Sequence, residues 1–173
     1  MVSQTLRVMG LDPGYGRCGW GVIQAEGQRL NAVACGVIET SAKTAFPARL
    51  LRLQDEIQTL IKAHAPGEAA IEQLYFSKNV KTGIDVGQAR GVALVTCARG
   101  GLAISEYKPV EIKLAVTGFG AAPKSQVQRM VKLLLKLEQE PELDDAADAL
   151  AVAICHVHSR ALKQHAANRT RPA

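Results

Sequence analysis

Three aspartates stand within five positions near the C-terminus, at the start of an apolar segment with the pattern of a helix: Asp144, Asp145 and Asp148. On a helix, Asp145 and Asp148 share one face with Cβ atoms about 5–6 Å apart. Like charges this close repel one another. Two interpretations follow: the acids cap the positive N-terminal end of the helix, or they hold a divalent cation. Further carboxylates at the same place would favour the cation.

Two other acids stand at predicted strand ends. Asp12 closes an apolar run and precedes the turn dipeptide Pro13-Gly14, and Glu72 lies in the short apolar run 69–74. A buried, unpaired glutamate is costly, so Glu72 either turns toward water or faces a cation. If these strands are parallel neighbours and the last helix begins beside them, Asp12, Glu72, Asp145 and Asp148 converge. Carboxylates so placed can hold two Mg²⁺ ions about 3.5–4 Å apart, which drive in-line displacement at phosphorus.

Aromatic and basic side chains alternate in the polar segment 75–82, which we expect to be a loop. Aromatic rings stack on unpaired bases and lysines contact phosphates, although the rings could equally anchor the loop to the core. A second basic group precedes and opens the helix predicted over 123–137, where a helix N-terminus favours a phosphate. The candidate DNA-binding residues are Tyr75, Phe76, Lys78, Asn79, Lys81, Lys113, Lys124 and Ser125.

Three glycines spaced by four, Gly83, Gly87 and Gly91, stand in the helix predicted over 83–99. Each costs about 1 kcal/mol relative to alanine in a helix interior, so a stripe of them indicates close approach of another backbone. That backbone is either the sheet or the helix of a partner subunit. The stripe is therefore our candidate for a dimer interface.

Length and composition fit one α/β domain. The chain has 173 residues, 47% of them hydrophobic, and 21 basic residues against 16 acidic ones give a net charge of +5 that leans modestly toward polyanionic partners. It contains no membrane-length apolar run and no secretion signal, so we expect a cytoplasmic protein. Four widely separated cysteines are expected to be buried free thiols: Cys18, Cys35, Cys97 and Cys155.

The order of predicted elements is β-β-β-α-β-α-β-α-α-α. It predicts a five-stranded mixed sheet, an antiparallel meander plus parallel strands, with helices on both faces. We expect a single α/β domain to span residues 1–160. Residues 161–173 are expected to form a basic, mobile tail, either a frayed end or an arm near phosphates.

Five motifs in register resemble the RuvC family of bacterial Holliday junction resolvases over about residues 6–160: Leu11-Asp12-Pro13-Gly14, Ala70-Ile71-Glu72-Gln73, Gly87-Gln88-Ala89-Arg90-Gly91, Lys124-Ser125-Gln126-Val127 and the seven residues from Asp145 to Ala151. The resemblance implies an RNase H-like fold, a homodimer and Mg²⁺- or Mn²⁺-dependent nuclease activity. It also implies symmetric nicks in two like-polarity strands of a four-way junction, 5′-phosphate and 3′-hydroxyl ends, a preferred cut sequence, and cooperation with the RuvA–RuvB branch-migration complex.

By position, the resemblance makes Asp12, Glu72, Asp145 and Asp148 the catalytic, metal-binding carboxylates. It places Tyr75 where the family has an aromatic that stacks on junction bases, and Lys113 and Lys124 near the junction backbone. Our hypothesis is that Asp12 bridges two ions and the other acids complete their coordination. Water then attacks the phosphate, and no covalent enzyme intermediate forms.

Other functions remain compatible with parts of the pattern. An RNase H-like nuclease of the YqgF type, which resembles a pre-rRNA processing enzyme, shares the opening strand and aspartate but does not need the aromatic-lysine loop. A non-catalytic junction-binding module would use the acids as helix caps. A sugar kinase or actin-like ATPase would need a duplicated domain and far more chain.

Overall fold

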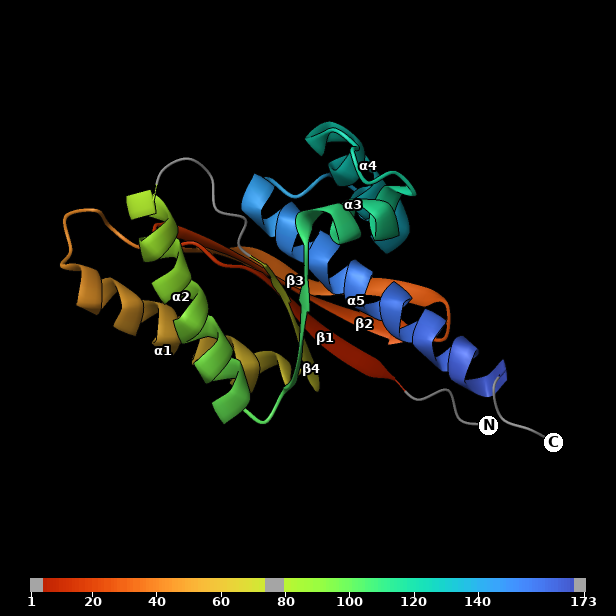
Figure 1. Cartoon of the computed structure of the whole chain (residues 1–173), viewed down its shortest axis with the longest axis horizontal. Coiled ribbons are helices and arrows are strands. Elements are labelled where there is room, and N and C mark those ends of the chain that lie inside the picture. Colours follow the sequence, from red (N-terminus) through yellow and green to blue (C-terminus); the bar gives the residue numbers. More distant parts are fainter. Residues whose placement is uncertain (1–4, 74–79, 170–173) are drawn as a thin grey trace.

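A five-stranded sheet forms the centre of the computed structural model, which describes the backbone of residues 5–73 and 80–169 and the side chains of 5–73 and 83–163 (Figure 1). Its elements are β1 (Leu6–Asp12), β2 (Arg17–Glu26), β3 (Arg29–Glu39), α1 (Phe46–His64), β4 (Glu68–Glu72), α2 (Val80–Arg99), β5 (Ala103–Tyr107), α3 (Pro109–Thr117), α4 (Lys124–Leu135) and α5 (Asp144–Arg169). The strand order is β3-β2-β1-β4-β5. The first three strands form an antiparallel meander, and β1, β4 and β5 run parallel. The predicted sheet is confirmed.

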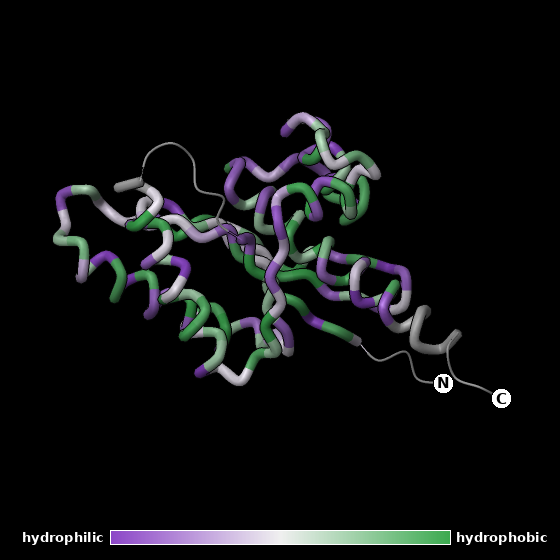
Figure 2. Tube along the Cα trace, viewed as in Figure 1, coloured by the Kyte–Doolittle hydropathy of each residue, from purple (hydrophilic) through white to green (hydrophobic). Residues whose placement is uncertain are grey.

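The side chains of each strand alternate between the two faces of the sheet, and so the hydrophobic core forms two layers. In β1, Met9 and Leu11 face α1 and α2, whereas Val8 faces α5, α3 and α4, because successive side chains point to opposite faces of a sheet. Helices therefore cover both faces, as predicted (Figure 1). Hydrophobic residues run along the strands, while the helices alternate between hydrophobic and hydrophilic residues, as one-sided packing requires (Figure 2).

Helix α5 lies directly on a patch of strand glycines. A Cβ at Gly10 would overlap the backbone oxygen of Ala149, and one at Gly19 would overlap the backbone oxygen of Asp145. A Cβ at Gly21 would lie 2.7 Å from Cδ2 of Leu150. Since Gly10 pairs with Gly21 in the β1–β2 register, the patch is continuous across both strands. The absence of side chains here lets α5 approach closely enough to carry its N-terminal end to the end of β1.

A buried polar network ties the middle of α5 to the two parallel strands. Nε2 of His156 lies 2.5 Å from Oε2 of Glu68, and Nδ1 of His156 lies 2.9 Å from the hydroxyl of Tyr107. Arg160 also pairs with Glu68. Because buried polar groups are costly without partners, this network fixes the position of α5 along the sheet.

Three expectations are corrected or refined by the elements themselves. Cys35 is exposed on the edge strand β3, whereas Cys18, Cys97 and Cys155 are buried thiols as expected. Helix α2 begins at Val80, so Lys81 lies in a helix and not in the preceding loop. None of the helices among the described residues has the length and hydrophobicity of a bilayer-spanning segment.

The glycine stripe of α2 does not face the sheet at its described end. The buried face of α2 carries Ala89, Ala93 and Cys97, and nothing lies within 4 Å of a Cβ built at Gly91. Of the two explanations for the stripe, close packing on the sheet is therefore wrong for Gly91. The other, a partner helix, stays a prediction.

The end of α5 does not coincide with the expected domain boundary at residue 160, because the helix continues to Arg169. At about 1.5 Å per residue, Arg160 lies roughly 22 Å along the axis from Asp145. The division into a domain and a tail stays a prediction.

Candidate active site

The four predicted carboxylates meet at one end of the sheet. Asp12 ends β1, Glu72 ends the neighbouring parallel strand β4, and Asp145 and Asp148 lie in the first turns of α5. Asp12, Asp145 and Asp148 each offer one carboxylate oxygen within 4.8 Å of the others. Glu72 lies close enough to Asp12 for the charge of Asp12 to raise the pKa of Glu72. The convergence predicted from strand ends and helix start is therefore present in the fold.

Burial and mutual repulsion disfavour the ionised forms of these acids. Burial, and then the charge of Asp148, raises the pKa of Asp12 to about 6. Burial, and then the charge of Asp12, raises the pKa of Glu72 to about 8. Burial also raises the pKa of Asp148, although Lys124 opposes that shift. In the absence of a bound cation, Asp12 and Glu72 consequently share a proton near neutral pH.

Two basic side chains contact the carboxylate cluster. Nζ of Lys124 lies 2.9 Å from Oδ2 of Asp148 and 3.4 Å from Oδ2 of Asp144. Nε of Arg17 lies 3.0 Å from Oδ2 of Asp145. Burial lowers the pKa of Lys124, but the hydrogen bond and charge of Asp148 outweigh it and raise that pKa. The positive charges of Lys124 and Arg17 therefore offset part of the negative charge of the clustered carboxylates.

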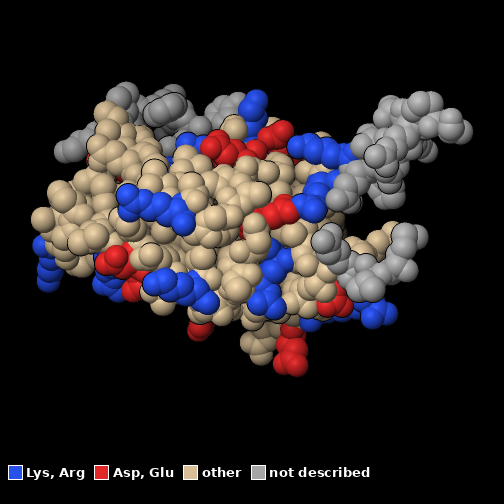
Figure 3. Space-filling view, turned by 90° about the horizontal axis from the view of Figure 1, so that it is seen from below, with Lys and Arg blue, Asp and Glu red and all other residues tan. Residues whose placement is uncertain are grey.

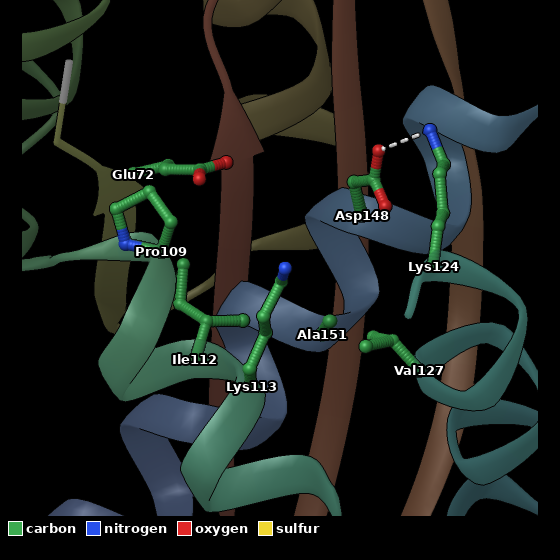
Figure 4. Close-up of a pocket in the computed structure, with 8 residues that line it drawn as sticks. All are labelled: Glu72, Pro109, Ile112, Lys113, Lys124, Val127, Asp148 and Ala151. Atoms are coloured by element: carbon green, nitrogen blue, oxygen red, sulfur yellow. Dashed lines mark ion pairs between the residues drawn. The ribbon is translucent and has the colours of Figure 1, made fainter. Parts of the chain in front are cut away.

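A cavity of about 220 Å³ opens beside the cluster, between α3, α4 and α5. Glu72, Lys113, Lys124 and Asp148 supply its polar lining, and apolar side chains such as Ile112 supply the rest. Figure 4 shows Glu72 and Lys113 pointing into the same space, across from the Lys124–Asp148 pair. The charge of Lys113 also lowers the pKa of Glu72. The cavity thus presents anionic and cationic groups together, as a phosphate and its counter-ions require.

The donor set fits a hard divalent cation. Mg²⁺ and Mn²⁺ prefer carboxylate oxygens, and three such groups lie within ligand-sharing distance here. Burial and neighbouring carboxylates raise the pKa values of Asp12 and Glu72, and a cation bound among these groups would oppose both effects. Asp12, Asp145 and Asp148 would hold an ion, with Glu72 beside them.

The predicted DNA-binding residues divide into described and undescribed ones. Lys113 and Lys124 line the cavity, and Ser125 is exposed in the first turn of α4. Tyr75, Phe76, Lys78 and Asn79 lie outside the described residues, as does the side chain of Lys81. The face seen in Figure 3 carries basic and acidic side chains interspersed, so the net positive charge does not form one continuous patch on that side.

Two arginines near the site were not singled out by the sequence. Arg17 contacts Asp145, and the buried Arg49 holds the loop that follows Asp12. Arg49 donates hydrogen bonds to Oγ1 of Thr40 at 2.9 Å and to the backbone oxygen of Tyr15 at 3.1 Å, and its guanidinium lies 4.8 Å from the Tyr15 ring centroid. Both arginines contact residues distant in sequence, so no local spacing signals them.

The sequence profile of the family described as crossover junction endodeoxyribonuclease RuvC matches residues 8–156. The chain belongs to the RuvC family. A crossover junction endodeoxyribonuclease RuvC from Petrotoga mobilis is 51% identical over 153 residues, which cover 88% of this chain and 94% of that protein. The corresponding protein from a Roseiflexus species is 50% identical over 153 residues, covering 88% and 91%. The family resemblance seen in the five motifs is confirmed.

Solved structures agree with this membership. Thermus thermophilus RuvC superposes with a TM-score of 0.85 at 29% identity, covering 91% of this chain and 97% of that one. The same protein in complex with Holliday junction substrate gives 0.87 at 28% identity, covering 91% and 96%. The RNase H-like fold of this RuvC-family chain is thereby confirmed.

Proposed function

We propose that this chain is a structure-specific endodeoxyribonuclease that resolves Holliday junctions in homologous recombination and DNA repair. It makes paired, symmetric nicks in like-polarity strands and leaves 5′-phosphate and 3′-hydroxyl ends. The observation that carries the proposal is the convergence of Asp12, Asp145 and Asp148 within 4.8 Å, with Glu72 beside them. Membership of the RuvC family and the junction complex of the Thermus thermophilus relative support the substrate.

The carboxylates would hold two Mg²⁺ ions, or Mn²⁺, which when bound neutralise the phosphate and promote hydrolysis by water. In this proposal Asp12 would serve both ions, which its closeness to Asp145, Asp148 and Glu72 supports. Because the pKa of Glu72 is raised to about 8, its carboxyl group carries a proton near neutral pH, and it would lose that proton on contacting a cation. With the carboxylates acting as metal ligands and water as the nucleophile, the mechanism needs no covalent intermediate on the protein.

Cationic side chains position the scissile strand. Lys113 and Lys124 line the cavity beside the carboxylates and would contact phosphate oxygens there. Ser125, exposed at the start of α4, would add a contact where the helix N-terminus favours an anion. Tyr75, Phe76, Lys78, Asn79 and Lys81 remain predicted contacts, with the aromatics stacking on unpaired junction bases.

A homodimer would supply the two active sites that paired nicks require, because a two-fold axis places them on opposed strands. The open side of α2 is our candidate interface. It carries Gly91, with nothing near it, and two large side chains that are more than half exposed, Ile84 at 53% and Val95 at 55%. Cooperation with the RuvA–RuvB complex belongs to the same proposal.

The decisive experiment is cleavage of a mobile four-way DNA junction with Mg²⁺, with both nicks mapped. We expect paired nicks at related positions, loss of cleavage in EDTA, and loss of cleavage with retained junction binding in Asp12→Asn. A junction that is bound but never nicked would identify a non-catalytic binding module. Preferential cleavage of structured RNA would instead identify a YqgF-type processing nuclease. Full cleavage by Asp12→Asn would show that the metal role is wrong.

A further inference from the structure

Arg17 stands outside every motif that carries the family resemblance, yet it directly contacts one of the proposed metal ligands. It opens β2, and its Nε lies 3.0 Å from Oδ2 of Asp145 and 3.5 Å from Oε1 of Glu39. Arg17 and Glu39 are register partners on β2 and β3, and cross-strand partners lie on the same face of a sheet. The guanidinium is thus held between a carboxylate of the sheet and one of α5.

The strand that carries Arg17 is also the surface on which Asp145 rests. Arg17 and Gly19 point to the same face because they are two residues apart on a strand. A Cβ at Gly19 would overlap the backbone oxygen of Asp145, so the helix backbone touches the strand there. Gly19 in turn pairs with Asp12. The start of β2 therefore contacts Asp145 at two points: Gly19 lies against the Asp145 backbone, and Arg17 pairs with the Asp145 carboxylate.

Charge and geometry would act in opposite directions at this position. A positive charge beside the cluster weakens binding of another cation, whereas an ion pair that holds a ligand carboxylate in one orientation strengthens it. Glu39 already offsets the charge of Arg17, and the Arg17 side chain is 48% exposed, so water screens much of what remains. The Asp145 side chain is only 27% exposed and is held at 3.0 Å. The orienting contact outweighs the residual repulsion.

We propose that Arg17 is a positioning residue, which holds the carboxylate of Asp145 in the orientation that binds the divalent cation. The inference rests on the proposed function, since it assigns Asp145 as a metal ligand. It adds a residue from the first hairpin to a site otherwise built from the ends of β1 and β4 and the start of α5. An outer partner of this kind contributes on the order of ten-fold or more in metal affinity.

The test measures Mn²⁺ binding to the DNA-free protein, by the paramagnetic resonance signal of the free ion, alongside junction cleavage. Arg17→Met is expected to weaken Mn²⁺ binding about ten-fold and to lower cleavage at subsaturating metal more than at saturation. Arg17→Lys keeps the charge but replaces the planar guanidinium held between Asp145 and Glu39 by a single ammonium on a flexible stem, so it is expected to remain impaired. Arg52→Met removes an exposed arginine of α1 whose nearest acid is at 4.0 Å, and serves as the matched control with wild-type binding.

A double-mutant cycle with Asp145→Asn identifies the residue through which Arg17 acts. Arg17→Met is expected to have no further effect on Mn²⁺ binding once Asp145 is altered. Unchanged or tighter binding in Arg17→Met, full recovery in Arg17→Lys, or an equal loss in the Asp145→Asn background would each overturn the inference. A wild-type protein that neither binds Mn²⁺ nor cleaves junctions would instead contradict the proposed nuclease function, on which the role of Arg17 rests. Circular dichroism melting of each variant verifies that the fold is retained.

Discussion

Nζ of Lys124 lies 2.9 Å from Oδ2 of Asp148, so a side-chain ammonium occupies the position beside a proposed metal ligand. The same nitrogen is 3.4 Å from Asp144. Lys124 stands on α4, and 49% of its side chain is exposed. It can therefore leave Asp148 and contact a phosphate when substrate and cation arrive.

Lys124→Met should separate metal binding from cleavage. Metal affinity is expected to rise a few-fold, because the Lys124 ammonium is a compact point charge on a flexible stem, which competes for Asp148 without fixing its orientation as the planar guanidinium of Arg17 does for Asp145. The cleavage rate is expected to fall, because a phosphate contact is lost. Mn²⁺ binding and single-turnover cleavage at saturating Mn²⁺ test the two effects separately. Weaker metal binding in this variant would show that Lys124 organises the ligands and does not compete with the cation.

The metal-free protein should lose stability as the pH rises. In the unfolded chain Glu72 ionises near its ordinary pKa of 4.5, whereas in the folded protein its pKa is about 8. The folded state then binds more protons across this window, so the free energy of unfolding falls from about pH 4.5 to about pH 8. Asp12, with a folded pKa of about 6, adds to the fall below that pH.

Melting temperatures in EDTA at pH 5, 6.5 and 8, for wild type and Glu72→Gln, measure this contribution. The wild type is expected to lose more stability than the variant as the pH rises, since glutamine does not titrate. Mg²⁺ should stabilise the wild type most at pH 8, where binding displaces the fewest protons. A wild type that loses no more stability than Glu72→Gln would contradict the shared-proton description of Asp12 and Glu72.

Gly19→Ala should uncouple α5 from the sheet at the active site. The added methyl group would overlap the backbone oxygen of Asp145, and neither backbone can move freely. Overpacking of this kind costs about 1–3 kcal/mol. We expect a corresponding drop in urea-unfolding stability and a loss of Mn²⁺ binding through displacement of Asp145.

Gly67→Ala is the matched control for Gly19→Ala, because nothing lies within 4 Å of a Cβ built at Gly67. Its stability is expected to stay within about 0.5 kcal/mol of wild type. Equal effects of the two substitutions would show that the glycine patch does not determine how α5 seats.

Gly91→Leu should break the proposed dimer without unfolding the monomer. A Cβ at Gly91 meets nothing within 4 Å, and leucine is a better helix former than glycine by close to 1 kcal/mol. Sedimentation should show monomers, with junction nicks no longer paired. Ala63→Leu, on the exposed side of α1, adds the same side chain elsewhere and should leave the dimer intact. A dimeric Gly91→Leu would place the axis away from this stripe.

The sequence by itself determined the order of elements and the identity of the acids. Alternating and helical periodicities are local properties, and so they predicted the meander, the buried parallel strand β4 and the helix Phe46–His64. Asp12 and Glu72 could be placed at one edge because parallel neighbours end together. The start of α2 was misplaced by three residues, since glycines at a helix end resemble the loop before it.

Only the tertiary structure decided the pKa values of the four acids and the contacts that hold them in place. The glycines at positions 10, 19 and 21 carried no expectation from the sequence, yet together they form the surface on which α5 packs. The contacts of Arg17 with Asp145 and of Lys124 with Asp148 join residues far apart in the chain. The raised pKa values of Asp12 and Glu72 likewise arise from burial and from neighbours on other segments. Desolvation and side-chain distance depend on packing, which no local pattern of residues encodes.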